Sequence, residues 1–75
     1  MSSERIFKIV IMELTSDNLK LEAELEKTIN SDLEINEKTN TIKTILAKMV
    51  AIDGSIVKFT NMITNNNNNN NLKED

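Results

Sequence analysis

The chain has 75 residues and a formal net charge of −3, and it contains neither cysteine nor histidine. Disulfides, thiolate zinc sites and imidazole chemistry are therefore excluded. A chain of this length forms at most one small domain, which buries only about 60% of its unfolded surface. With two phenylalanines, one glycine and no proline, tryptophan or tyrosine, a well-packed globular core is not expected, so oligomerisation is the remaining way to stabilise the fold.

The first helix is predicted to begin near Ser3, where a hydroxyl can cap it and Glu4 lies near the positive end of the helix dipole. The apolar run from Ile6 to Leu14 is too short to span a membrane, which needs about 20 residues. No small-residue cleavage site follows this run, so we expect no signal peptide and a cytoplasmic protein, or alternatively a nuclear one. Apolar side chains cover most of the circumference here, which predicts more than one neighbouring helix.

Three clusters of turn-forming residues interrupt the helical pattern: Thr15 to Asn18, Asn30 to Asp32, and Thr39 to Thr41. At the second cluster, Ser31 and Glu34 fit a capping box. Either of the last two clusters could make a helical hairpin, with arms from about Ser3 to Asn30 and from about Ser31 or Thr41 to Thr64. The clusters contain neither glycine nor proline, which favours the alternative of one continuous helix about 90 Å long.

The strongest pattern is a set of seven apolar residues spaced alternately by three and four positions, as in the a and d positions of a heptad. These residues are Ile42, Ile45, Met49, Ile52, Ile56, Phe59 and Ile63. They form one narrow stripe that a single helix cannot bury. We expect it to be too long for its own chain to cover, so helices of other chains are predicted to bind it.

The same a frame continues backwards by sevens, and the residues at its positions are Ile35, Thr28, Leu21, Leu14 and Phe7. The companion d positions hold Val10, Asp17, Glu24, Ser31 and Lys38, of which only Val10 is apolar. This pattern predicts a strong seam at each end of the chain and a weak one in the middle. Phe7, Val10, Leu14 and Leu21 form a second predicted interface patch, and the polar Thr28 and Lys38 would set register and partner choice.

Charge is unevenly distributed along the chain. Residues 13–37 contain eight acidic residues and two lysines, whereas residues 38–64 contain four lysines and one acidic residue. This asymmetry suits an antiparallel second copy, a folded-back helix or a different partner of opposite pattern. Four lysines without arginine are too sparse to bind a phosphate backbone, so no nucleic acid is expected. Gly54 lies between two residues of this stripe, Ile52 and Ile56, and is expected to mark a bend or a close helix contact.

Seven consecutive asparagines begin at Asn65 and are followed by a short charged end. Such a tract has no apolar face to bury, so residues 65–75 are predicted to be a disordered poly-Asn tail and residues 1–64 a helical coiled-coil region.

No catalytic, cofactor-binding or metal-binding residues are predicted. A glycine-rich phosphate loop and an EF-hand pattern are absent, and Glu22, Glu24 and Glu26 point to different sides of a helix. We therefore expect no enzyme and no cofactor.

The predicted fold class is all-α, a long helix or helical hairpin that forms a coiled coil or small helical bundle. The expected function is a small helical subunit of a multi-subunit scaffold or assembly complex, or a homo-oligomer, whose partners are other helical chains. The pairs Ile29-Asn30 and Ile35-Asn36 loosely resemble subunits of the DASH ring of kinetochores and of the complexes that build lysosome-related organelles, and no family is assigned from them. The alternative is a regulatory adaptor or inhibitor that folds as an amphipathic helix on a partner protein.

Overall fold

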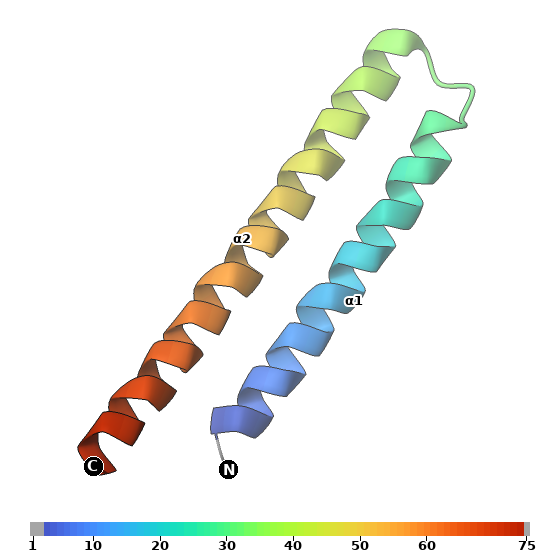
Figure 1. The fold of residues 1–75 in the computed structure, drawn as a ribbon. Helices are drawn as coiled ribbons and strands as arrows, with labels where there is room; N and C mark the ends of the chain where they lie inside the picture. Colours follow the sequence, from blue (N-terminus) through green and yellow to red (C-terminus); the bar gives the residue numbers. More distant parts are fainter. Residues whose placement is uncertain (1–2, 75) are drawn as a thin grey trace.

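The computed structural model describes residues 3–74, and side chains are described for residues 3–65. Two helices, α1 (Ser3–Ile29) and α2 (Ile35–Glu74), run antiparallel and are joined by residues 30–34 (Figure 1). The Cα atoms occupy a rod of 62 × 18 × 13 Å. The all-α class is confirmed. The chain forms the hairpin and not the continuous helix that the missing glycine and proline favoured.

The end of α1 is fixed by the turn-forming cluster at residues 30–32. Asn30 Nδ2 donates to the carbonyl oxygen of Glu26 at 3.0 Å, and Ser31 Oγ donates to that of Thr28 at 2.6 Å. The same two carbonyl oxygens also accept from the backbone N–H groups of Asn30 and Ser31, at 3.2 and 3.1 Å, so side chain and backbone together close the last turn of the helix. Polar side chains that bond to nearby backbone therefore replace the glycine that usually ends a helix.

The start of α2 is capped by Glu34. Its Oε2 accepts from the backbone N–H of Glu37 at 3.3 Å, and its carbonyl oxygen accepts from the N–H of Lys38 at 2.8 Å. The predicted capping box led by Ser31 is wrong, because the Ser31 hydroxyl bonds to the end of α1 instead. A cap needs an acceptor oxygen directly before the first helical turn, and Glu34 occupies that position.

Lys38 ties the two helices together at the turn. Its Nζ donates to the carbonyl oxygen of Ile29 at 3.2 Å, so an ammonium group lies at the negative end of the α1 dipole. Thr28, the other polar residue expected to set register, is half-buried, and its hydroxyl donates to the carbonyl oxygen of Glu24 at 2.8 Å. Lys38 thus helps to set register within one chain, while its effect on partner choice stays a prediction.

We expect Lys38→Met to lower the free energy of unfolding by about 1 kcal/mol, because it removes a charged hydrogen bond and a favourable dipole contact. Thermal melting followed by circular dichroism at fixed chain concentration measures this loss, which corresponds to about 5 °C in Tm. Lys20→Met, at an exposed position of α1, is the matched control that removes the same charge. Coincident melting curves for the two variants would show that the Lys38 contact contributes nothing.

The face of α1 that packs on α2 also follows a heptad, with steps of four and three. The half-buried residues that follow this spacing are Phe7, Ile11, Leu14, Asn18, Leu21, Leu25 and Thr28, and Val10 beside them is half-buried too. The predicted companions Asp17 and Glu24 are exposed, so their place in the seam was wrong. The weakness of the middle of the seam stays a prediction. An α-helix has 3.6 residues per turn, so the residue three positions before a stripe residue and the residue four positions before it lie almost equally close to the stripe. Spacing alone therefore does not decide which of the two belongs to it. Because residues 30–34 form a turn, the heptad positions of α2 do not continue by sevens into α1.

Two further expectations fail along the helices. The helix continues through Thr15 to Asn18 without a break, because the stripe of α1 crosses this cluster and packs on α2. Ile35, expected in the seam, is 74% exposed, since it begins α2 at the turn, beyond the end of α1. The backbone of residues 65–74, within the predicted disordered tail, continues α2, and no side chain is described after residue 65. The disorder of this tail and the boundary at residue 64 stay predictions.

Candidate interaction surface

The seven residues of the strong stripe all lie on the inner face of α2, against α1. Ile45 is 5% exposed and is the only buried side chain in the described range, residues 3–65. The other six are half-buried, as expected when only one neighbouring helix covers them. The stripe packs on α1 of the same chain, so the expectation that its own chain could not cover it is wrong.

The second predicted patch packs against the first. Phe7, Val10, Leu14 and Leu21 are all half-buried. At the open end of the hairpin, the rings of Phe7 and Phe59 have centroids 5.5 Å apart with an interplanar angle of 44°, a tilted arrangement that aromatic pairs prefer. All eleven predicted interface residues thus form one seam inside the chain, and their contact with another chain stays a prediction.

Asn18 places a polar side chain within this seam. Its Nδ2 donates to Asp53 Oδ1 at 2.8 Å, and its own Oδ1 is buried without a hydrogen-bond partner among the described residues. A buried acceptor without a partner costs about 1–3 kcal/mol. Sequence reasoning missed Asn18, although its spacing of four from Leu14 and seven from Ile11 and Leu25 was visible in the sequence.

Heptad positions divide the outside of the hairpin into two broad sides. In α1, Ile11, Asn18 and Leu25 are a residues and Phe7, Leu14, Leu21 and Thr28 are d residues, while in α2 Ile42 is an a residue and Ile45 a d residue. In an antiparallel pair the g positions of both helices flank one side of the seam, and the e positions flank the other.

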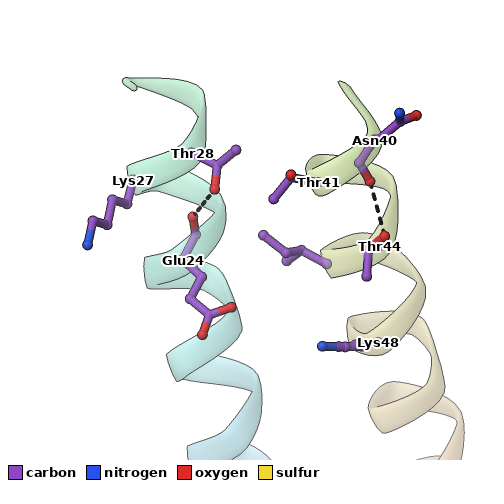
Figure 2. A pocket seen from close by; sticks show the side chains of 8 residues that line it. Glu24, Lys27, Thr28, Asn40, Thr41, Thr44 and Lys48 are labelled. Atoms are coloured by element: carbon purple, nitrogen blue, oxygen red, sulfur yellow. Dashed lines mark hydrogen bonds between the residues drawn. The ribbon is translucent and has the colours of Figure 1, made fainter. Parts of the chain in front are cut away.

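The g side is polar and slightly hollowed. A groove there is lined by Glu24, Lys27, Thr28, Asn40, Thr41, Thr44, Ile45 and Lys48. Figure 2 shows Glu24 and Thr28 on the α1 wall of this groove and Thr41, Thr44 and Lys48 on the α2 wall. The hydroxyls of Thr28 and Thr44 donate to carbonyl oxygens one turn earlier in their own helices, at 2.8 and 3.1 Å, so they serve the backbone.

The e side mixes exposed apolar side chains with charged ones, among them Lys8, Glu22 and Asp53. The residues that we call the outer apolar face occupy its e and b positions and are Met12, Leu19, Ile29, Leu46, Val50 and Val57. Their exposed fractions run from 44% for Leu46 to 71% for Met12. Large apolar side chains gathered on one side of a small protein mark a surface that binds another molecule.

A shallow depression adjoins this face on α2, between Val50 and Val57 and beside Gly54. A Cβ atom built on Gly54 would meet nothing within 4 Å, so the close contact expected at this glycine is not made within the described chain. The helix continues through Gly54. The glycine therefore leaves the backbone of α2 accessible from outside.

The described residues provide no other kind of site. No cluster of three or more Asp or Glu side chains that could hold a metal ion occurs among them. Within the same range, neither α1 nor α2 has an apolar stretch long enough to cross a membrane. A scan of family models, a search of curated proteins and a search of solved structures each found no match to this chain.

Proposed function

We propose that this chain is a non-enzymatic interaction protein, a helical hairpin that binds further helices as a small subunit of a larger assembly or as a homo-oligomer. The single observation that supports it is the outer apolar face, which no part of the described chain covers. Each large apolar side chain that a partner covers completely contributes about 1.5–3 kcal/mol. The stripe on the inner face supplies the hairpin that presents this surface.

Marginal stability supports the same proposal. Only Ile45 is buried among the side chains of residues 3–65, so the hairpin has almost no enclosed core. Chains of this size reach useful stability through disulfides, metals or association, and this one has no cysteine. We place the protein in the cytoplasm or nucleus on the sequence pattern alone.

Photocrosslinking in the native cell tests the proposal. A photoreactive amino acid at position 19, on the outer apolar face, is expected to give a crosslinked product larger than the single chain. The matched control carries the same amino acid at position 20, on the polar side of α1, and is expected to give none. Absence of any product from position 19, with the full chain expressed and helical, would contradict an interaction function.

The alternative, an adaptor that folds only on its target, predicts a different behaviour for the isolated chain. Circular dichroism over a dilution series separates the two, because a self-associating hairpin loses helix as the chain is diluted. An adaptor that needs its target shows little helix at every concentration. The hairpin is favoured because the stripes of α1 and α2 already cover one another in a single chain.

A further inference from the structure

We infer that the partner of the outer apolar face is a second copy of this chain, in a symmetric four-helix bundle. In this dimer, α1 packs antiparallel on α1 and α2 on α2, so the two turns lie at opposite ends. The inference rests on the proposed function and specifies its partner. Isologous dimers of this type are the commonest oligomers, and they require a surface that is complementary to itself.

The exposed face of α1 is self-complementary when one copy is reversed. Along its e and b positions, Lys8, Met12, Leu19 and Glu22 present a positive charge, two apolar side chains and a negative charge in that order. An antiparallel copy places Met12 opposite Leu19 and Lys8 opposite Glu22, with the midpoint near residue 15. In that arrangement apolar meets apolar and each lysine meets a carboxylate.

The exposed face of α2 has the same symmetry. Val50 and Val57 lie on either side of Asp53 and Gly54, so a reversed copy places Val50 opposite Val57 with the midpoint between residues 53 and 54. A twofold axis must cross both helices at the same height. The hydrogen bond of 2.8 Å from Asn18 to Asp53 sets the middle of α1 beside the middle of α2, to within about one turn.

The residues nearest the axis fit a close crossing. Gly54 has open space where a Cβ would lie, so two α2 helices can approach closely there. Asp53 lies near its own copy at the axis, where two carboxylates repel, and the hydrogen bond from the neutral Asn18 amide stabilises each carboxylate without cancelling its charge.

The available area is also sufficient. The 27 residues of α1 extend about 40 Å at 1.5 Å per residue, and the rod is 18 Å wide. The face of each copy is thus roughly 700 Å², close to the ~800 Å² per partner of a standard stable interface.

Sedimentation equilibrium of the purified full chain tests the inference, with circular dichroism to verify that each variant remains helical. The chain has a mass of 8.5 kDa, so a dimer sediments as about 17 kDa. Leu19→Asp is expected to give monomers. Lys8→Glu and Glu22→Lys should each weaken the dimer about tenfold at low ionic strength, and the double variant should restore it.

Lys20→Glu is the matched control, because it reverses an exposed charge on the polar side of the same helix. It is expected to leave the dimer Kd unchanged. A dimer that responds to Lys20→Glu but not to Lys8→Glu would overturn the assignment of the face. If the chain is a monomer at tens of micromolar and position 19 crosslinks to a different protein, the partner is not a second copy of this chain. The proposed interaction function would still hold. If the chain neither associates in solution nor gives a crosslinked product, both the dimer and the proposed interaction function are contradicted.

Discussion

Replacement of Ile45 by aspartate is expected to abolish the helical hairpin. Ile45 is the most enclosed side chain in the described range, at 5% exposed, and it lies between the two helices at the base of the polar groove. A carboxylate buried in an apolar seam costs about 3–5 kcal/mol. A chain of this length has a total stability of about 4–11 kcal/mol. With only one buried side chain among residues 3–65, this hairpin belongs at the low end of that range, where the loss removes most of the stability.

Far-ultraviolet circular dichroism of the purified chain measures the outcome, and Ile45→Asp is expected to lose most of its helical signal at 25 °C. Ala47→Asp is the matched control, since Ala47 is exposed on the outer side of the same turn of α2. It is expected to melt close to the native chain, because surface substitutions usually change stability by less than about 0.5 kcal/mol. Equal helicity in the two variants would contradict the assignment of Ile45 to the centre of the seam.

The inner face of α2 could be predicted from sequence because its pattern has no exception. Seven apolar residues from Ile42 to Ile63 keep alternate steps of three and four, and all of them face α1. Such a stripe has one low-energy solution, which is to pack on another helix. The turn was also visible at Asn30 to Asp32, although periodicity alone could not decide between a turn and a continuous helix.

The inner face of α1 could be predicted only in part. Phe7, Val10, Leu14 and Leu21 were found and are half-buried. The heptad frame of α2, however, continued from Val10 to Asp17 and Glu24, which are exposed, and so missed the series that begins at Ile11. Tertiary packing rotates α1 so that Ile11, Asn18 and Leu25 face inward. Sequence also could not show which apolar side chains stay exposed, because exposure depends on which sides of α1 and α2 the turn brings together.

Asn18→Leu is expected to stabilise the hairpin by about 1–2 kcal/mol. The substitution removes a buried Oδ1 that has no partner and replaces it with apolar surface at an a position of the seam. It also removes the hydrogen bond to Asp53, but that carboxylate is exposed and water can replace the lost donor. The expected rise in Tm at fixed chain concentration is about 5–10 °C.

The same substitution is expected to make the alignment of α1 along α2 less well defined. The Asn18 amide reaches Asp53 only in the folded-back register of this hairpin, and a single asparagine at an a position is known to select register and oligomeric state. Asn18→Leu is therefore expected to give a broader distribution of masses in sedimentation velocity. Asn40→Leu, at an exposed position of α2, gains the same helix propensity and should keep a single species. Equal Tm values for the two variants would mean that the buried oxygen carries no penalty, and a single species for Asn18→Leu would mean that leucine specifies this register equally well.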